Sequence, residues 1–156
     1  MFSFSVEFDA SGPEGQIAED FGIGSPAQKT WDRIVFDGST PYMPMVTGTF
    51  INQSISATNF GSGELVYPGP FAHYLWMGIL YVDPEYGKGA FFDPDLGFWS
   101  RPGVTKVPSG RELEFNKEAN PNADPRWVER AAADNYPQWE AEMQRHADAG
   151  FPMGGE

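Results

Sequence analysis

Residues 25–38, SPAQKTWDRIVFDG, carry the signals of one amphipathic helix. Ser25-Pro26 provides a capping hydroxyl and a proline suited to the first helical position, and Gln28 can complete a capping box. Apolar side chains then recur at helical spacing and form one stripe, which consists of Ala27, Trp31, Ile34 and Val35. The sequence therefore predicts a helix over 26–38, which ends at Gly38 and which the following prolines prevent from continuing.

Segments of β-like sequence lie on both sides of this helix. Phenylalanine and valine alternate with serine and acidic residues over 2–9, which predicts a strand with one solvated face. After the helix, residues 49–59 and 63–67 are predicted to form a hairpin that turns at Gly61–Gly63. Residues 78–83 contain a run of apolar side chains and predict a further strand.

The longest stretch without a regular pattern covers residues 84–112, where prolines and glycines interrupt the chain repeatedly. A stretch of this length is typical of a functional loop or an arm. Large aromatic rings that no local pattern buries often anchor a subunit contact. We therefore predict that this long loop reaches a neighbouring subunit through Phe91, Phe92, Phe98 and Trp99.

The C-terminal part is predicted to be helical after a short closing strand at Leu113–Phe115. Asp124-Pro125 is a helix start, and Pro137 is predicted to kink or break the helix, with a second segment after it. The last residues, 151–156, are predicted to form a flexible tail. The buried stripes of the two segments are predicted to consist of Trp127, Val128, Ala131, Ala132 and Tyr136, followed by Trp139, Met143 and Ala147.

Together these elements predict an α+β fold. A small, mainly antiparallel β-sheet is expected to pack against the helix in the N-terminal half and against the C-terminal helices. One long irregular loop is expected to leave this body. We expect a single domain over residues 1–150.

Composition limits the classes of function. The chain has 156 residues, 40% of them hydrophobic, a formal net charge of −12 and no cysteine. An acidic surface repels phosphate backbones, which argues against DNA wrapping or recognition of a DNA sequence. It is compatible with a basic partner surface, or with a passage through which DNA slides without adhering. The lack of cysteine excludes disulfides and thiolate metal sites. No apolar run is long enough to span a bilayer, and neither a membrane partner nor a signal peptide is expected.

Several short motifs follow one another in a specific order. They are Pro41-Tyr42-Met43-Pro44, Thr47-Gly48, Tyr67-Pro68-Gly69-Pro70-Phe71-Ala72-His73-Tyr74, Val82-Asp83-Pro84, Lys106 with Arg111-Glu112-Leu113-Glu114-Phe115, and Trp127-Val128-Glu129-Arg130. In this order they resemble the minor capsid or head–tail joining proteins of tailed phages, which form the neck and complete the tail. The resemblance covers residues 25–148. The motif positions that it marks as structural are Pro41, Tyr42, Pro44, Thr47, Gly48, Tyr67, Pro70, Phe71, Ala72, Tyr74 and Trp127.

The resemblance implies a structural virion protein, not an enzyme, with no cofactor and no metal. Its partners would be copies of itself in a six-fold or twelve-fold ring, and the adjacent neck, portal-adaptor or tail proteins. DNA would pass through the ring without specific binding, and acidic residues that line the channel would weaken phosphate adhesion. The protein would be made in the cytoplasm of the bacterial host and would lie at the head–tail interface of the virion.

Two other classes of function stay open. A carbohydrate-binding β-rich module would use exposed aromatic rings. The densest aromatic group, most of which we expect in the core, consists of Tyr67, Phe71, Tyr74, Trp76 and Tyr81. A hydrolase would need paired carboxylates. The acids considered for such a pair are Asp83, Glu85, Asp93 and Asp95. The same acids do not form a calcium loop, because they lack its alternating pattern of ligands. His73 and His146 are far apart in the sequence, and neither has a predicted catalytic or metal partner.

Overall fold

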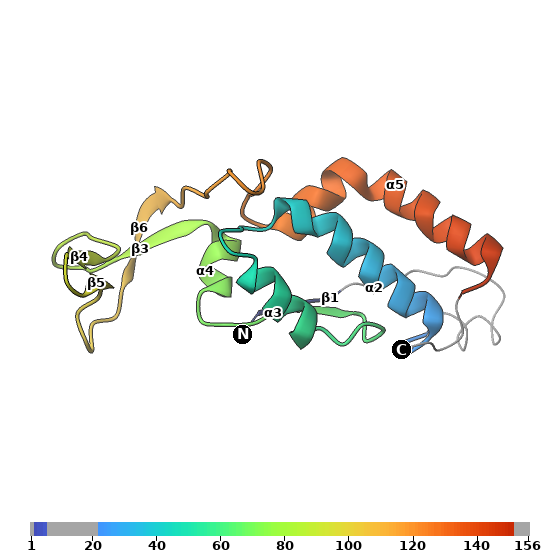
Figure 1. The fold of residues 1–156 in the computed structure, drawn as a ribbon, viewed down its shortest axis with the longest axis horizontal. Coiled ribbons are helices and arrows are strands. Elements are labelled where there is room, and N and C mark those ends of the chain that lie inside the picture. Colours follow the sequence, from blue (N-terminus) through green and yellow to red (C-terminus); the bar gives the residue numbers. More distant parts are fainter. Residues whose placement is uncertain (1, 6–21, 152–156) are drawn as a thin grey trace.

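The computed structural model describes residues 2–5 and 22–151. Figure 1 shows a body built mainly of helices and, at one end of it, an arm of β-strands. The fold is α+β, as predicted, but the described strands form three two-stranded antiparallel sheets instead of one small sheet. Residues 6–9 of the predicted first strand, and the predicted tail except Phe151, lie outside the described residues.

The first helix, α2 (Pro26–Ser39), confirms the predicted helix and its apolar stripe. The Ser25 hydroxyl caps the helix by accepting a hydrogen bond from the backbone N–H of Gln28 at 3.1 Å. All the predicted stripe residues are buried, namely Ala27, Trp31, Ile34 and Val35. Gly38 lies inside α2, where a Cβ would come within 2.4 Å of Nε1 of Trp139. This glycine therefore permits a close approach of the last helix.

The last helix, α5 (Trp127–Ala149), packs along α2 and runs in the opposite direction (Figure 1). Of the two outcomes predicted at Pro137, a kink or a break, the break is wrong, because the helix continues through this residue. Proline has no N–H group, so Pro137 cannot donate the helical hydrogen bond to the carbonyl of Ala133. Both residues are exposed, so water can bond to that carbonyl instead. The predicted start at Asp124-Pro125 is too early, since the left-handed residue Arg126, with φ 52°, precedes the first helical residue.

Five of the eight residues predicted for the buried stripe of α5 are buried, namely Trp127, Val128, Ala131, Trp139 and Met143. The predicted Ala132 and Ala147 are only partly buried. Tyr136 is 46% exposed, and its ring meets Trp31 edge-on with 6.0 Å between the centroids. Neither α5 nor any other helix in the described ranges combines the length and the apolar character that a bilayer crossing requires.

Most of the predicted strand 49–59 is helical. Gly48, with φ 78°, leads the chain into α3 (Thr49–Ala57). The buried side chains of this helix are Ile51 and Ser54, three residues apart, so burial follows the helical period. The β-branched content of the segment favoured a strand, and packing of one helical face against the body overrides that preference. The predicted hairpin is therefore wrong.

The strand β2 (Glu64–Tyr67) pairs instead with β1 (Phe2–Ser5), in antiparallel register. The glycine-rich turn that precedes β2 is bound by Asp32, a fully buried residue of α2. Its Oδ2 accepts hydrogen bonds from the backbone N–H groups of Gly61 at 2.7 Å and Gly63 at 3.1 Å. These charge-assisted bonds attach the turn to the helix.

Aromatic rings fill the core between α2, α5 and the β1–β2 sheet. The ring centroid of Tyr67 lies 5.1 Å from that of Trp127 and 6.1 Å from that of Phe36. A short helix that the sequence did not predict, α4 (Ala72–Met77), contributes Trp76, whose ring centroid is 5.0 Å from that of Trp127. Ring contacts thus join α2, β2, α4 and α5 in one core.

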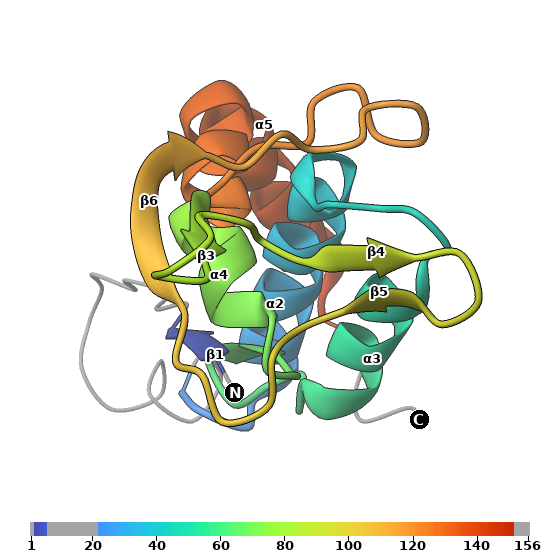
Figure 2. The ribbon, with the colours of Figure 1, turned by 90° about the vertical axis from the view of Figure 1, so that its left-hand side faces the viewer.

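The arm comprises residues 79–112 and contains two short antiparallel ladders. One ladder forms its stem, and the other forms a hairpin at its tip. Figure 2 views the molecule from the arm side and shows the two hairpin strands side by side in front of the helices. The stem strands are β3 (Ile79–Val82) and β6 (Val107–Glu112), and the hairpin strands are β4 (Phe91–Asp93) and β5 (Gly97–Trp99).

The arm confirms one sequence prediction and corrects two. Strand β3 confirms the strand predicted over 78–83. The region predicted as an irregular loop, 84–112, contains a hairpin and the second stem strand. The predicted closing strand at Leu113–Phe115 is wrong, because the chain pairs with β3 just before it, through β6. Since β6 contains a proline and a glycine and lacks alternation, only its pairing with β3 makes it a strand.

Candidate functional site

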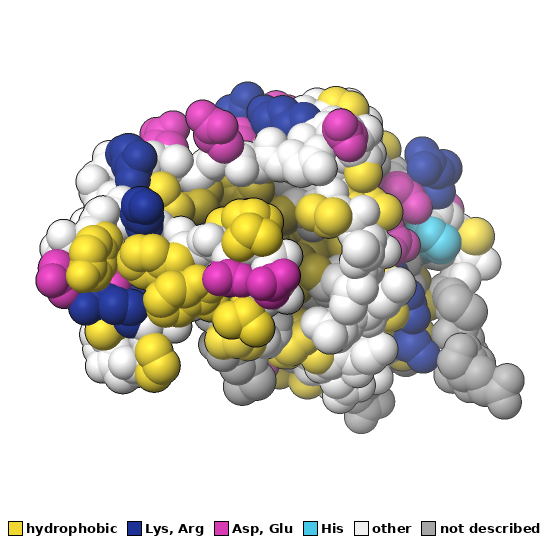
Figure 3. Space-filling view, turned by 60° about the vertical axis from the view of Figure 1, so that its left-hand side comes forward, with side chains coloured by type: hydrophobic (Ala, Val, Ile, Leu, Met, Phe, Trp, Pro, Cys, Tyr) yellow, Lys and Arg dark blue, Asp and Glu magenta, His cyan; other side chains and the backbone are white. Residues whose placement is uncertain are grey.

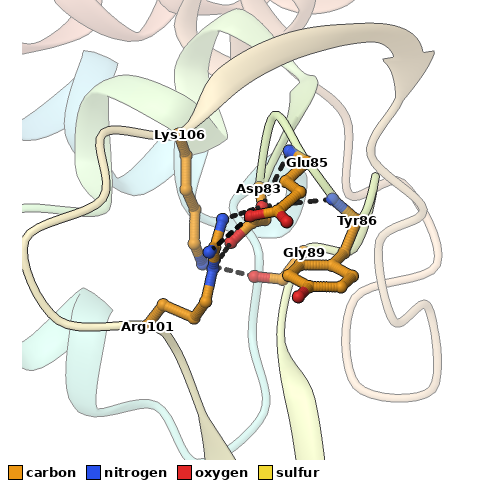
Figure 4. Close-up of polar contacts among 6 residues, drawn as sticks. All are labelled: Asp83, Glu85, Tyr86, Gly89, Arg101 and Lys106. Carbon is orange, nitrogen blue, oxygen red and sulfur yellow. Dashed lines mark hydrogen bonds and ion pairs between the residues drawn. The ribbon is translucent and has the colours of Figure 1, made fainter.

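An ion-pair cluster holds the base of the tip hairpin (Figure 4). Asp83, which directly follows β3, is only 3% exposed. The Arg101 guanidinium donates two hydrogen bonds to its carboxylate, from Nε to Oδ2 at 2.6 Å and from Nη2 to Oδ1 at 2.8 Å. Its Nη1 donates to Oε2 of Glu85, also at 2.6 Å. This fork joins the chain before the hairpin to the chain after it.

The backbone adds to this cluster and fixes its charge state. The N–H groups of Glu85 and Tyr86 donate to Oδ1 of Asp83 at 2.9 and 3.2 Å. The hydrogen bonds from Arg101, aided by these N–H groups, lower the pKa of Asp83 to about 2, although burial acts in the opposite direction. The same ion pair raises the pKa of Arg101. Asp83 is therefore ionised at neutral pH and unsuited to act as a general acid.

Ring contacts connect the ion-pair cluster to the hairpin. The guanidinium carbon of Arg101 lies 4.8 Å from the ring centroid of Tyr86, in a cation–π arrangement. The Tyr86 ring in turn meets Phe91 of β4 edge-on, with 5.5 Å between centroids. Lys106 adds a further tie, since its ammonium group donates to the carbonyl oxygen of Gly89 (Figure 4). The hairpin is thus held at its base by polar and aromatic contacts together.

The structure brings together the four aromatic residues that were predicted as interface residues. Phe91 lies opposite Trp99 in the β4–β5 register, and Phe92 lies opposite Phe98. The first pair stacks with 4.9 Å between centroids, and the second pair is tilted at 5.2 Å. Because successive side chains in a strand point to opposite faces, the two pairs occupy opposite faces of the hairpin. Only the second pair is exposed on both strands, since Phe91 is partly buried.

The apolar surface of the tip is formed by Phe92, Leu96 and Phe98, which are 65%, 80% and 79% exposed. We call these three residues the tip patch. An Asp93 turn presents Leu96, because the Asp93 carboxylate accepts hydrogen bonds from the N–H groups of Asp95 at 2.8 Å and Leu96 at 3.0 Å. Figure 3 shows hydrophobic side chains gathered on the arm side of the molecule. Leu96 was not among the predicted interface residues, although its place just after an Asp-Pro-Asp turn indicates exposure.

The segment Pro41–Pro44 is tied to the C-terminal part of the chain. The Tyr42 hydroxyl donates to Oδ2 of Asp134 on α5 at 2.9 Å, and the Asn120 amide donates to the carbonyls of Thr40 and Met43 at 3.0 and 2.9 Å. The first residues of this segment form η1 (Thr40–Tyr42), a short 3₁₀ helix. These contacts hold the segment in place between α2 and α3.

The other motif residues divide by burial. Those in the core are Tyr67, Ala72 and Trp127. Gly48 is the cap of α3, Pro44 is partly buried, and the remaining motif residues are exposed, namely Pro41, Thr47, Pro70, Phe71 and Tyr74. Phe71 and Tyr74 correct the expectation that most of the aromatic group around them lies in the core, since only Tyr67 and Trp76 of that group are buried.

Neither a metal site nor an acid pair for hydrolysis forms from the acids considered. No group of three or more potential ligands from His, Cys, Asp and Glu comes together in the described residues. Asp83 and Glu85 share Arg101, and Asp93 supports its own turn. A pocket of about 520 Å³ lies at the N-terminal end of α2, beside Lys29 and Arg33, and the described residues that line it include no acid.

Comparison with known proteins adds no relative. No family model matches the chain, and neither a curated protein nor a solved structure matches it. The functional interpretation therefore depends on the motifs of the sequence and on the geometry of the arm.

Proposed function

We propose that the protein is a structural subunit that assembles with copies of itself through the arm, as a ring in the neck of a tailed phage. The observation that carries this proposal is the tip patch. Three large apolar side chains are exposed at the end of a projecting hairpin, where they do not contribute to the chain's own hydrophobic core. Apolar groups in such a position become buried when a neighbouring subunit covers them.

The order of the arm supports the same proposal. A flexible loop would lose conformational entropy on binding, and that loss would lower the affinity of the contact. Here the bidentate Arg101–Asp83 ion pair and the stacked Phe91–Trp99 pair hold the hairpin in one conformation within the single chain. An arm that is ordered in advance is well suited to repeated contacts between identical subunits.

The neck of a tailed phage is proposed because of the motif order in the sequence, with the acidic character of the chain as further support. The motifs from Pro41 to Trp127 resemble head–tail joining proteins in their succession. A net charge of −12 would let DNA pass through a ring with little adhesion. In this role the adjacent neck, portal-adaptor or tail proteins are the further partners, the virion is the location, and the ring is six-fold or twelve-fold.

Carbohydrate binding is the competing proposal, and exposed aromatic rings on the arm favour it. Sugar stacking uses flat aromatic faces. The planes of Phe92 and Phe98 are inclined at 58° to each other, so this pair offers no continuous flat platform. Assembly is therefore the better-supported function.

Point substitutions in the tip patch test this proposal. Phe92→Ser combined with Phe98→Ser should weaken self-association by at least about tenfold, since interface aromatics are frequent hot spots. Val46→Ser is the matched control, because Val46 is as exposed as Phe98 but lies outside the arm. Light scattering over a concentration series measures the effect. Equal masses for the tip variant and the wild type would contradict the proposal, and a glycan array would then test carbohydrate binding.

A further inference from the structure

The pocket at the N-terminal end of α2 combines apolar and basic side chains. Its volume is about 520 Å³, and a cavity of about 150 Å³ accepts a benzene ring, so the pocket has room for more than one large side chain. Ile23, which is 84% exposed, and Phe60 line it with apolar surface. Lys29 and Arg33 lie one helical turn apart on α2 and line it with two positive charges. We call this site the α2 pocket.

Basic residues are scarce on this chain, which has 10 of them against 22 acidic residues. The described residues that line the α2 pocket include no acid. Lys29 and Arg33 are both exposed, and neither belongs to the ion pairs formed among the described residues. Asp37, one turn beyond Arg33, lies outside the lining. The pocket is therefore a local basic site on an acidic chain, and it favours an occupant that carries carboxylates.

Contacts within the chain hold the α2 pocket in shape. The Gly61 carbonyl accepts a hydrogen bond from the N–H of Gly24 at 2.7 Å, and the Gly61 N–H donates to the buried Asp32 carboxylate, also at 2.7 Å. The guanidinium carbon of Arg33 lies 3.8 Å from the ring centroid of Phe60, in a cation–π arrangement. The pocket therefore presents the Arg33 charge in a fixed position, which lowers the entropic cost of binding.

The tip hairpin has the opposite charge. Residues 91–99 contain Asp93 and Asp95 and no basic residue. Asp95 is exposed, and neither aspartate belongs to an ion pair formed among the described residues. The nearest basic residues along the chain, Lys88 and Arg101, lie at the base of the hairpin, where the Lys88 carbonyl and the Arg101 guanidinium both bind Asp83. Carboxylates thus accompany the tip patch, so the tip complements the α2 pocket in charge and in apolar surface.

The two surfaces lie at opposite ends of the molecule. In Figure 1 the arm lies at one end of the longest axis, and α2 begins at the other end. The tip of a chain therefore cannot reach the α2 pocket of the same chain, and the contact requires a second copy. Because the two surfaces differ, such a contact is heterologous and can repeat from copy to copy.

We infer that the tip hairpin of one copy binds the α2 pocket of the next copy. This inference rests on the proposed self-assembly and adds the acceptor surface. Leu96 lies in the apolar part of the pocket, and the carboxylates of Asp93 and Asp95 face its two basic side chains. Repetition of this contact around a rotation axis closes the ring.

Another exposed apolar group lies on α4 and is less suited to receive the tip. Its exposed side chains are Phe71, Tyr74 and Met77. The N–H of Leu113 donates to the carbonyl of Gly78, the residue after α4, at 2.8 Å. This bond brings the exposed Glu112 and Glu114 near the end of α4. Their carboxylates would repel the carboxylates of the tip.

Charge reversal, measured by light scattering over a concentration series, tests the inference. Lys29→Glu places an acid in the α2 pocket, and Asp95→Lys places a base on the tip. Each variant alone should associate at least about tenfold more weakly than the wild type, because like charges meet at the contact. A chain that carries both substitutions should recover most of the affinity, because opposite charges meet again. Lys117→Glu is the matched control, since Lys117 is exposed outside both surfaces and its reversal changes the net charge as Lys29→Glu does.

The outcomes separate the inference from the proposed function. Weak association of both single variants, with recovery in the double variant, supports the inference, and a double variant no stronger than the single ones contradicts it. If Phe92→Ser with Phe98→Ser fails to assemble while Lys29→Glu assembles like the wild type, the acceptor lies elsewhere, so the inference is wrong and the proposed function stands. If the wild type stays monomeric at the highest attainable concentration, the proposed function and the inference are both wrong. Circular dichroism of each variant checks that the fold is kept.

Disulfide trapping gives an independent readout, because the chain has no cysteine of its own. Pro94→Cys places a thiol in the hairpin turn, and Asn59→Cys places one at an exposed position in the lining of the α2 pocket. Mixed and oxidised, the two single variants should form a disulfide-linked dimer. Pro94→Cys mixed with His73→Cys, an exposed position on α4, is the control. Equal cross-linking of both mixtures would contradict the inference.

Discussion

Arg101 binds Asp83 through two parallel hydrogen bonds, although the two residues are eighteen positions apart in the sequence. The pair closes the segment that carries the tip hairpin, and the buried position of Asp83 protects it from competing water. The arm is therefore an ordered structure in the isolated chain. This order matters for the proposed function, because it removes part of the entropic cost of assembly.

Removal of the Arg101 side chain should loosen the arm and leave the body unchanged. In Arg101→Gln the Asp83 carboxylate loses its bidentate partner, and the base of the hairpin opens more often. Hydrogen exchange at the Asp83 and Gly87 amides, which are bonded across this turn, should become faster. Arg111→Gln is the matched control, since among the described residues the Arg111 guanidinium donates one hydrogen bond, of 3.3 Å, to the Gly87 carbonyl. Unchanged exchange in Arg101→Gln would argue that other contacts hold the arm.

The same ion pair gives the arm a defined sensitivity to acid. Because the pKa of Asp83 is lowered to about 2 in the folded protein, its ionised form is favoured by folding. This stabilisation is complete above the ordinary aspartate pKa and is lost as the pH falls from about 4 to about 2. A carboxyl-carbon NMR titration of Asp83 should give a midpoint near 2 in the wild type and a higher midpoint in Arg101→Gln. Equal midpoints would contradict the role of Arg101.

Gly38 should be intolerant of even a methyl group. Gly38→Ala places a Cβ 2.4 Å from Nε1 of Trp139, so α2 and α5 must move apart. Overpacking of this kind costs about 1–3 kcal/mol of unfolding free energy. Chemical denaturation measures the loss. Gly89→Ala is the control: its Cβ meets the end of the Leu80 side chain at 3.3 Å, which can shift, so a smaller loss is expected.

Asp32 should be essential for the turn before β2. Asp32→Ala leaves the buried Gly61 N–H and the Gly63 N–H without their acceptor, which should cost about 2 kcal/mol or more of unfolding free energy. Asp32→Asn keeps one carbonyl oxygen at the site and should lose less stability. Thermal unfolding of the two variants compares them, and equal stability of Asp32→Ala and the wild type would contradict the assignment.

Helix α2 could be predicted from the sequence because its cap and its stripe are local signals. Ser25 and the spacing of its apolar residues determine the helix without help from distant parts of the chain. Helix α3 could not be predicted, since its isoleucines suggest a strand until the packing of Ile51 and Ser54 is known. The continuity of α5 at Pro137 likewise depends on which side of the helix meets solvent.

The candidate site was predictable in composition but not in geometry. The aromatic residues at 91, 92, 98 and 99 are recognisable because no local pattern buries them. Their pairing across a hairpin, and the choice of the outward pair, depend on strand register, which no periodic pattern of these residues indicates. Arg101 and Asp83 were not paired from the sequence, because nothing local links residues eighteen positions apart. The exposure of Phe71 was missed for the same reason.

The most direct test of the central claim, that the arm joins copies of this chain, is the solution mass with and without the distal part of the arm. Val82 lies opposite Val107 in the stem, so an Asn-Gly turn can replace residues 83–106 and leave the stem paired. We expect the wild type to form a closed oligomer and the shortened chain to be monomeric with an unchanged body. A wild type that stays monomeric, or a shortened chain that still forms the same oligomer, would contradict it.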